Sequence, residues 1–421
     1  MLVEFSATNF RSISEVQKLT LVAGPGKEHL GQNTFDPGLA GFPRLLRSAV
    51  IYGANAAGKT NLLRALQFMQ QLVVTSATFQ EATRVAHSPF RLSRKTTASP
   101  SEFEVAFVDE GVRYEYGFSV DTNRVHKEWL IAYPRGRPQN WFERTFDAKK
   151  NTYEWQFSAK LKGSPRVWRD ATRANALFLA TATQLNSEQL RAVFQWFQKK
   201  LVVIIATGAS QLNVGLTFQL LEQPDGKQKL LKFVKAADLG IDDLSLQRVP
   251  LAPMAAIDGN VVREPQPGGQ IPSVMRVTSY HKASDSEQRV AMDLGDESSG
   301  TQALFHSAGA WLNVLRNGEV ILYDELDTSL HPLMTRFLIG LFHDKSTNPK
   351  NAQLVFTTHD TSLLDSEIFR RDQVWFIEKD KKGASRLYPL SDFSPRKDEK
   401  LERGYLRGRY GALPFIGELK L

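Results

Sequence analysis

The stretch GANAAGKT at residues 53–60 fits the pattern of a phosphate-binding loop, G-x-x-x-x-G-K-[ST]. Glycines let the backbone N–H groups of such a loop turn toward nucleotide phosphates, and the helix that follows adds its positive end. In this pattern Lys59 reaches the β and γ phosphates and Thr60 supplies a ligand to Mg²⁺. The alternative is an ordinary glycine-rich turn before a helix. We therefore expect ATP and Mg²⁺ to bind, with nucleotide contacts from Gly53, Ala54, Asn55, Ala56, Ala57, Gly58, Lys59, Thr60 and Asn61.

Two later apolar runs end in residues that could act on a bound nucleotide. The run EVILYDE ends in Asp324, which would hold Mg²⁺ through water, and Glu325, which would polarise the attacking water as general base. The run QLVFTTHD places His359 at a strand end, within reach of a γ-phosphate. Alone, acids at a strand end are often a solvated terminus, and a single histidine there is more often a surface residue. With the loop upstream, we predict Lys59, Glu325 and His359 as catalytic residues and Thr60 and Asp324 as metal ligands.

An alternation of helices and strands would position these residues. Residues 45–75 read as a buried strand, the glycine-rich turn and a helix. After residue 290 the pattern alternates again, which implies a parallel sheet whose strand ends carry the ligand site. The expected elements are a helix at 301–318, a strand at 319–325, a helix at 331–344 and strands at 352–359 and 373–379.

The rest of the chain reads differently. Alternating residues after Met1 and the run KLTLVAG predict an N-terminal hairpin, and short aromatic runs between residues 80 and 290 predict an antiparallel sheet. Helices interrupt this region at 187–201, with Ser187 as N-cap, and at 227–240, ended by Gly240. A Pro- and Gly-rich loop is expected at 250–272, with a strand after it at 273–281. No element is assigned to the basic, glycine-punctuated end, residues 402–421.

Composition restricts the classes of function. The chain of 421 residues has 53 Lys and Arg against 45 Asp and Glu, a formal charge of +8, which permits nucleic acid as a partner without requiring it. It has no cysteine, which excludes disulfides, thiolate zinc sites and cysteine nucleophiles. Neither a signal peptide nor an apolar run long enough to span a membrane is apparent. We expect a cytoplasmic protein that does not insert into membranes.

Taken together, the motifs resemble those of ABC-type ATPase heads in their order. A phosphate-binding loop is followed far downstream by SSGTQ, then ILYDE, then TTHD, as the loop, signature, acidic strand and switch histidine follow one another in that family. By this resemblance Ser299, Gly300 and Gln302 match the signature and would grip the γ-phosphate of an ATP bound to another subunit. The match departs from the family at Thr301, usually a second glycine, and at Ser298, usually leucine. Without the other motifs, SSGTQ would be an ordinary N-capped helix start.

Further stretches narrow the resemblance to one branch. FSATNFRSI at residues 5–13 resembles the first strand of the SMC, RecF and OLD branch, and DELDTSLHP at 324–332 resembles OLD-type AAA-core ATPases, with Asp327 in the D-loop position. GYLRGRYGALP at 404–414 resembles stand-alone ATPases of prokaryotic abortive-infection and anti-phage operons. The family's Q-loop is not placed, and no long coiled coil or following nuclease domain is apparent, so the resemblance implies an ATPase without its own effector.

The expected fold is an α/β ABC-type P-loop ATPase head with a mostly parallel core sheet, an N-terminal antiparallel sheet and an α+β insertion. Residues 1–75 and 291–390 would form the head, 76–290 the insertion and 391–421 a basic tail. The resemblance implies a homodimer or higher homo-oligomer closed by Mg-ATP that controls a separately encoded toxin or nuclease in anti-phage defence. The alternative is a RecF-like DNA-binding clamp for repair. A transporter ATPase is disfavoured by the altered signature.

Overall fold

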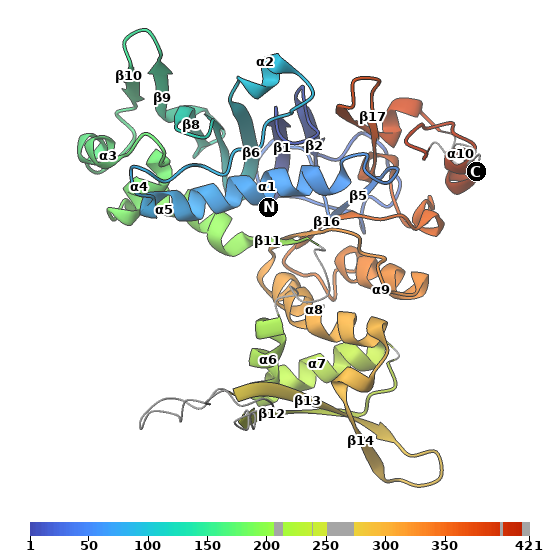
Figure 1. Ribbon diagram of the computed structural model, residues 1–421. Helices are drawn as coiled ribbons and strands as arrows, with labels where there is room; N and C mark the ends of the chain where they lie inside the picture. The colour runs from blue at the N-terminus through green and yellow to red at the C-terminus, as the bar shows by residue number, and fades with distance from the viewer. Residues whose placement is uncertain (206–213, 238, 251–272, 396–398, 415–421) are drawn as a thin grey trace, which may run out of the picture. The chain divides into compact units, whose positions relative to one another are not determined.

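The chain forms two compact units in a computed structural model (Figure 1). The structure describes residues 1–205, 214–237, 239–250, 273–395 and 399–414. Unit 1 comprises Met1–Ala206, Val314–Thr328 and Thr335–Leu421, and unit 2 comprises Thr207–Asn313 and Ser329–Met334. The predicted insertion at residues 76–290 is therefore divided between the two units, because its aromatic strands belong to unit 1 and its second half belongs to unit 2.

Unit 1 contains the α/β sheet that the sequence predicts. Its order is β11-β15-β16-β5-β17-β18, and all neighbours are parallel except the final β17–β18 hairpin. Every residue of β5 and β16 is buried, as expected for strands covered on both faces. The strands are β5 (Ser48–Tyr52), β11 (Leu201–Ile204), β15 (Val320–Tyr323), β16 (Gln353–Thr357), β17 (Val374–Lys379) and β18 (Ser385–Pro389).

The order of this sheet explains how distant motifs meet. Strand β16 lies between β15 and β5, with Tyr323 opposite Phe356 and Thr357 opposite Ile51. Because the three strands are parallel, they end at the same edge of the sheet. The residues that follow them, which include Gly53 and Asp324, therefore emerge side by side.

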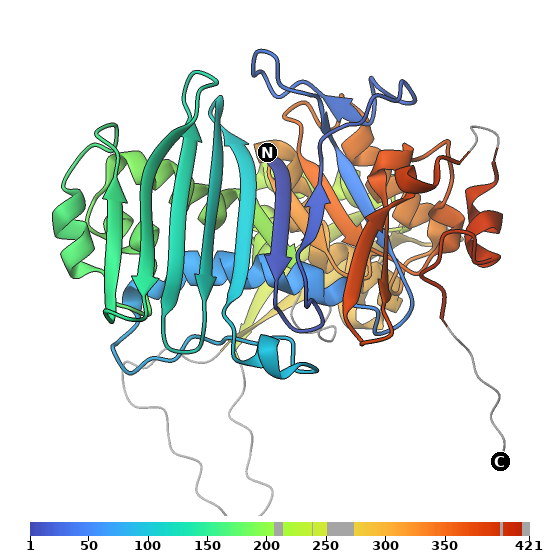
Figure 2. The same ribbon diagram turned by 90° about the horizontal axis from the view of Figure 1, so that it is seen from above.

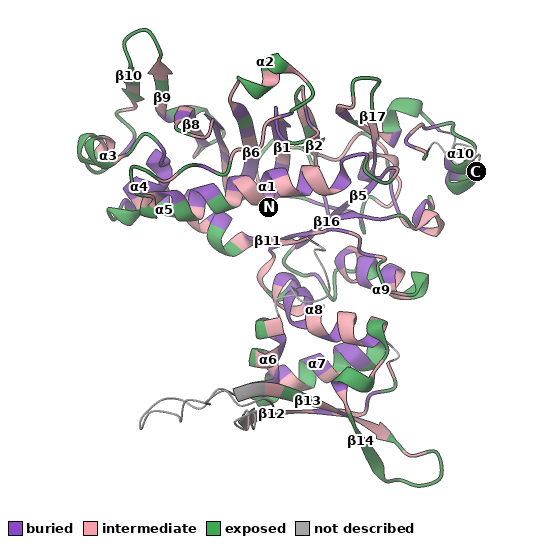
Figure 3. Cartoon of the chain, viewed as in Figure 1, coloured by how far each residue is buried: buried purple, intermediate pink, exposed green. Residues whose placement is uncertain are grey.

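The second sheet of unit 1 has seven antiparallel strands in the order β10-β9-β8-β7-β6-β1-β2 (Figure 2). The predicted hairpin and aromatic strands are both present, but they form one continuous sheet because β1 pairs with β6. Helix α1 (Lys59–Thr75) runs behind this sheet and buries Leu62, Leu66 and Met69 at helical spacing (Figures 2 and 3). The strands are β1 (Leu2–Thr8), β2 (Gln17–Thr20), β6 (Ser101–Asp109), β7 (Val112–Val120), β8 (Val125–Tyr133), β9 (Gln139–Asp147) and β10 (Thr152–Phe157).

Short elements complete the outer part of unit 1. The predicted helix at 187–201 begins as expected, because the Ser187 side chain accepts a hydrogen bond from the Leu190 N–H and caps α5 (Glu188–Gln195). It ends earlier than predicted, because residues 201–204 pair with β15 as strand β11 and a π-helical turn connects the two. The other elements here are β3 (Thr34–Phe35), β4 (Leu45–Leu46), α2 (Arg94–Thr97), α3 (Pro165–Ala171) and α4 (Phe178–Gln184).

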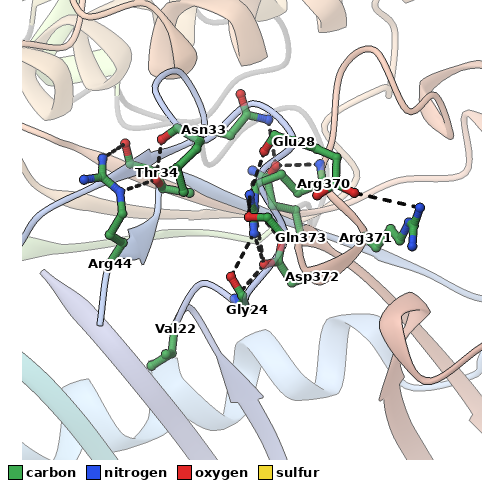
Figure 4. Close-up of polar contacts among 12 residues, drawn as sticks. Val22, Gly24, Glu28, Asn33, Thr34, Arg44, Arg370, Arg371, Asp372 and Gln373 are labelled. Carbon is green, nitrogen blue, oxygen red and sulfur yellow. Dashed lines mark hydrogen bonds and ion pairs between the residues drawn. The ribbon is translucent and has the colours of Figure 1, made fainter. Parts of the chain in front are cut away.

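A polar network joins the two sequence halves of unit 1 (Figure 4). The Arg370 guanidinium is 2% exposed and donates to the carbonyl oxygens of Gly24, Gly26 and Glu28, while it also pairs with Asp372 at 2.7 Å. The Asp372 carboxylate in turn accepts from the Gly24 N–H at 2.7 Å. A buried arginine whose donors are satisfied in this way fixes the N-terminal loop on the C-terminal half of the sheet.

Part of the predicted tail is folded. Helix α10 (Leu401–Leu406) buries Leu401 and Tyr405, and the Phe376 ring of β17 stacks on Tyr405 and Tyr410 with centroid distances of 5.4 and 5.7 Å. Residues 399–414 are therefore part of the folded unit, whereas the last seven residues lie outside the described chain.

The predicted helix at 331–344 is also present, as α9 (Pro332–His343). None of the helices in the described residues has both the length and the apolar character to cross a membrane.

Unit 2 combines helices with a three-stranded antiparallel sheet in the order β12-β13-β14. The predicted helix and strand are present as α7 and β13, although α7 ends at Ala236 and Gly240 lies four residues beyond it with a φ of 68°. The predicted loop at 250–272 lies outside the described residues after Pro250. The elements are α6 (Val214–Glu222), α7 (Pro224–Ala236), β12 (Asp243–Pro250), β13 (Ser273–Lys282), β14 (Arg289–Asp293) and α8 (Ser299–Asn317), whose residues from Val314 on belong to unit 1.

Candidate nucleotide site

The loop between β5 and α1 has backbone geometry that explains its glycines. A Cβ at Gly53 would lie 2.3 Å from the Ile377 carbonyl oxygen, so only glycine fits there. Gly58 has a φ of 118° and is the N-cap of α1, and Ala56 also has a positive φ of 61°. The loop therefore curls over the N-terminus of a 17-residue helix, which is the arrangement that binds phosphate groups.

Two serines hold this loop from outside. The Ser385 hydroxyl of β18 lies 2.6 Å from the Ala57 carbonyl oxygen and 2.8 Å from the Ser12 hydroxyl. The Ser12 hydroxyl also accepts from the Asn61 amide at 2.8 Å, and a Cβ at Gly58 would lie 2.1 Å from Ser385 Oγ. The sequence analysis assigned no role to Ser12, although it lies in the stretch FSATNFRSI, and it missed Ser385, which lies in no motif and more than 300 residues from the loop.

Lys59 and His359 meet at this site. Lys59 is 6% exposed, and its ammonium group donates to the carbonyl oxygens of Gly53 and Ala54 and to His359 Nε2, at 2.8, 3.3 and 3.0 Å. Burial lowers the pKa of Lys59, although the carboxylate of Glu325 opposes this shift. Burial and the Lys59 charge lower the pKa of His359. Both effects favour a neutral imidazole that accepts the lysine hydrogen bond through Nε2.

The surroundings of Lys59 fit a phosphate anion. The hydrogen-bond partners of its ammonium group in the described residues are two carbonyl oxygens and an imidazole, and the carboxylates of Glu325, Asp324 and Asp327 act on it through charge without an ion-pair contact. A buried cation without a paired anion is costly unless a ligand supplies the negative charge. Together with the glycine loop and the helix N-terminus, this donor set suits the triphosphate of a nucleotide.

The two predicted acids that follow β15 are positioned by a threonine of the neighbouring strand. Asp324 is 2% exposed, and its carboxylate accepts from the Thr357 hydroxyl at 2.7 Å. The same hydroxyl accepts from the Glu325 N–H at 2.7 Å, and Glu325 has a positive φ of 54°. Carboxylate and hydroxyl oxygens are ligands that Mg²⁺ accepts, and Asp324 and Thr60 carry such groups. Thr357 lies in the TTHD stretch, but its role was not predicted.

Asp327 lies in the same unit and contacts the histidine segment. Its carboxylate oxygens accept from the His359 N–H at 3.2 and 3.3 Å. The Glu325 side chain accepts from the Thr328 hydroxyl at 3.3 Å. The segment 325–328 is therefore held by one hydrogen bond within itself and by the bonds from the His359 N–H to Asp327. Unit 1 therefore brings together five predicted site residues from three regions of the sequence: Lys59, Asp324, Glu325, Asp327 and His359.

The predicted signature residues belong to unit 2. Ser298 caps α8, because its hydroxyl accepts from the Thr301 N–H at 3.1 Å. Gln302 donates to the carbonyl oxygens of Gly295 and Glu297 at 3.0 and 2.8 Å, so its amide binds its own loop. Gly300 packs closely, since a Cβ there would lie 2.6 Å from the Ser329 carbonyl oxygen. The structure thus assigns Ser299, Gly300 and Gln302 to a different compact unit from the other site residues.

The N-terminal stretch TNFRSI has a mainly structural part in the fold. The Asn9 side-chain amide donates to the carbonyl oxygens of Thr96, Ser99 and Pro100, and its oxygen accepts from the Phe90 N–H. Asn9 therefore fixes the loop around α2. Arg11 is exposed with a φ of 52° and makes a cation–π contact with the Phe10 ring.

Comparisons with known proteins place the chain in a family. No curated protein matches it. Among solved structures, a crystal structure of an Smc head domain with an extended coiled coil bound to the C-terminal domain of ScpA, from Pyrococcus furiosus, is 11% identical, with a TM-score of 0.36 and coverage of 92% of this chain and 96% of that chain. A structure of the recombination mediator protein RecF with ATP is 15% identical, with a TM-score of 0.36 and coverage of 92% and 99%.

The family match covers both halves of the ATPase motifs. The profile described as "AAA domain, putative AbiEii toxin, Type IV TA system" matches residues 48–191 and 220–365, which is more than half of the chain. These ranges include the phosphate-binding loop, the acidic strand and His359, whose geometry is described above. The chain belongs to this family and is an ATP-hydrolysing P-loop enzyme.

Proposed function

We propose that this chain is a Mg²⁺-dependent ATPase that acts as a nucleotide-driven dimeric switch and regulates a separately encoded effector of a prokaryotic anti-phage system. The observation that carries the ATPase part of the proposal is the 3.0 Å contact between Lys59 and His359 beside a buried acidic strand end. Lys59, Glu325 and His359 are the proposed catalytic residues, and Thr60 and Asp324 are the proposed metal ligands.

In the proposed reaction, Lys59 and His359 act as a pair. The ammonium group of Lys59 exchanges its carbonyl and imidazole partners for the β- and γ-phosphate oxygens of ATP, which carry more negative charge. His359 is neutral because its pKa is lowered, and the loss of the lysine bond frees its ring to face the γ-phosphate. The Asp327 carboxylate holds the backbone of residue 359 in place during this exchange.

The two acids that follow β15, Asp324 and Glu325, have different proposed roles in the reaction. The Asp324 carboxylate is held by the Thr357 hydroxyl, and it would share a metal ion with Thr60. Bound Mg²⁺ would neutralise charge on the β- and γ-phosphates. Glu325 is less buried than Asp324 and would orient and deprotonate the attacking water. The Thr357 hydroxyl couples the two acids, because it bonds the side chain of one and the N–H of the other.

The dimeric switch rests on the resemblance to ABC-type heads. In such an arrangement, Ser299 and the N-terminus of the 19-residue helix α8 would contact the γ-phosphate of ATP bound by a second copy. Gln302 would contribute by fixing the loop before α8 through its two backbone bonds. The control of a separately encoded effector rests on the resemblance to stand-alone ATPases of abortive-infection operons, and the family description, which names a putative AbiEii toxin and a type IV toxin–antitoxin system, links the family to such systems.

The first test is the mass of the Glu325→Gln protein in solution by light scattering, with and without Mg-ATP. The 47.3 kDa chain should shift to a species of about 95 kDa or more when ATP is bound and hydrolysis is blocked. Ser299→Arg in the same background should abolish the shift while ATP still binds, and Ser284→Arg, an exposed serine of unit 2, should not. Lys59→Ala should abolish hydrolysis.

The outcomes separate the parts of the proposal. If Lys59→Ala and Glu325→Gln proteins hydrolyse ATP as fast as wild type, the assignment of the catalytic residues is wrong. If hydrolysis is lost but the mass never changes, the site is correct and the dimeric switch is refuted. Co-expression with the product of a neighbouring gene tests the effector, because a regulator should co-purify with it in a nucleotide-dependent way.

A further inference from the structure

The positive charge of the chain is concentrated in one segment of unit 1. Residues 121–200 contain 15 of the 53 Lys and Arg and 7 of the 45 Asp and Glu, a net charge of +8. The other 341 residues contain 38 of each and are neutral, so this segment accounts for the whole formal charge of the protein. An excess of this kind on a folded surface creates a local positive potential that attracts polyanions.

Four cations of this segment lie at one end of the antiparallel sheet. Arg135 and Arg137 lie in the turn between β8 and β9, and Lys160 and Lys162 lie in the loop that follows β10. Because β8 and β10 both run antiparallel to β9, the turn after β8 and the loop after β10 occupy the same end of the sheet. We call Arg135, Arg137, Lys160 and Lys162 the loop surface.

The four side chains of the loop surface are exposed to solvent and carry charges that are not used in ion pairs of the described residues. All four side chains are exposed, and within the described part of the chain none of them forms an ion pair. Other cations of the same segment are paired, such as Lys150 with Asp147 and Glu154. The unpaired cations therefore keep their full charge for a partner in solution.

The backbone that carries the two lysines is held in place. The Gln189 side chain accepts from the Lys162 N–H at 2.8 Å and donates to the Lys160 carbonyl oxygen at 3.2 Å. Gly163 has a φ of 102°, and a Cβ there would lie 2.4 Å from the Trp168 ring. The loop is thus closed against α5 and a tryptophan, so little backbone entropy is lost when its cations bind a ligand.

We propose that the loop surface binds the phosphate backbone of a nucleic acid. Arginine forks bind phosphate oxygens through two donors at once, and both turn residues of the loop surface are arginines. A hollow of about 520 Å³ adjoins Lys162 and is lined by Trp168 and Asn186, which offer a ring edge and an amide group to a base or sugar; Glu188 also lines it. This binding is separate from the ATPase site and does not depend on the proposed control of an effector.

The test compares two variants of equal charge. In the first, all four residues of the loop surface are changed to Glu, which lowers the formal charge from +8 to 0 because each change removes two charges. The control carries Lys229→Glu, Lys232→Glu, Lys345→Glu and Lys350→Glu, four exposed lysines outside residues 121–200, and also has a formal charge of 0. Affinity for labelled 30-nucleotide single-stranded and duplex DNA is measured by fluorescence anisotropy over a salt series.

The loop-surface variant should lose at least about tenfold in affinity at low salt, and the control should stay within about threefold of wild type. The slope of log K against log salt should fall by about 3 to 4 in magnitude if each cation contacts one phosphate. Both variants should keep wild-type ATP hydrolysis and the same midpoint of urea unfolding, which shows that they fold.

Three results would overturn the proposal. Wild-type protein that does not bind either DNA at 50 mM salt would do so, as would equal losses in the two variants, which would indicate a general charge effect. The third is a loop-surface variant that binds DNA normally but loses sedimentation with phosphatidylserine vesicles, which would assign the surface to an anionic membrane. Failure of the ATPase tests above would leave the DNA measurements unaffected.

Discussion

Replacing Ser385 by alanine tests whether the phosphate-binding loop is held from outside. The hydroxyl of Ser385 is buried, with the residue 2% exposed, and it contacts the Ala57 carbonyl oxygen at 2.6 Å and the Ser12 hydroxyl at 2.8 Å. The change removes both contacts without adding bulk near Gly58. Since Ser385 lies behind the loop and is not among the groups proposed to face ATP, its loss should alter the shape of the loop and leave the catalytic groups in place.

The expected size follows from the two contacts. A buried hydrogen bond contributes about 1 kcal/mol net, so the loss of two costs about 2 kcal/mol. If half or all of that cost falls on the nucleotide-bound loop, the Kd for ATP rises by about 5- to 30-fold. The value of kcat should stay within about twofold, because Lys59, Glu325 and His359 remain.

Calorimetric titration of ATP and steady-state hydrolysis measure the two quantities separately. Ser391→Ala, which changes an exposed serine of the same C-terminal segment, is the matched control and should leave both unchanged. A Ser385→Ala protein with wild-type ATP affinity and an undiminished urea midpoint would show that the loop needs no support from β18. A loss confined to kcat would contradict the assignment of Ser385 to positioning.

Three further results are expected. His359→Gln should lower kcat by about 100-fold with ATP affinity within about threefold, because the ring is proposed to act on the γ-phosphate, and equal losses in affinity would refute this role. Thr357→Val should raise the Mg²⁺ concentration for half-maximal hydrolysis by about 5- to 30-fold, since it frees the Asp324 carboxylate, and an unchanged titration would contradict this. Burial lowers the pKa of His343 to about 3, so the unfolded chain takes up the proton first as pH falls and stability is lost below pH 6.5. Between pH 7.5 and 5.5 the wild type should lose about 1.4 kcal/mol through this group, a loss that His343→Gln should remove when urea unfolding is compared at the two pH values.

The strand–loop–helix unit at residues 48–75 and the parallel sheet were predictable because their requirements are local. Only glycine fits at Gly53 and Gly58. Two glycines at this spacing, followed by lysine and threonine at the start of a helix, are typical of a phosphate-binding loop. The apolar runs of β15 and β16 are continuous because both faces of the sheet are covered. Each of these patterns is contained within about ten consecutive residues, so the loop and the buried strands can be recognised from a single sequence.

Other features depend on pairings that no local pattern contains. The sequence predicts a helix that runs to Leu201 and no strand after it, but residues 201–204 form β11 because the edge of β15 offers parallel hydrogen-bond partners. The N-terminal hairpin and the aromatic strands read as two sheets, and only the β1–β6 ladder makes them one. In each case the strand partner is about a hundred residues away, so tertiary pairing overrides the local preference.

The supporting residues of the nucleotide site show the same limit at the level of single side chains. Thr357, Ser12 and Ser385 are small hydroxyl residues, which occur throughout the chain and have no spacing that marks a function. Each becomes informative only through its partners: Thr357 through Asp324 and Glu325, Ser385 through Ala57, and Ser12 through Ser385 and Asn61. A motif identifies the groups that face a ligand, because their chemistry is specialised, whereas the residues that orient them need only one donor or acceptor at the correct distance. Variants of such positioning residues therefore test the structure more directly than variants of the motif residues, whose loss a sequence pattern alone would predict.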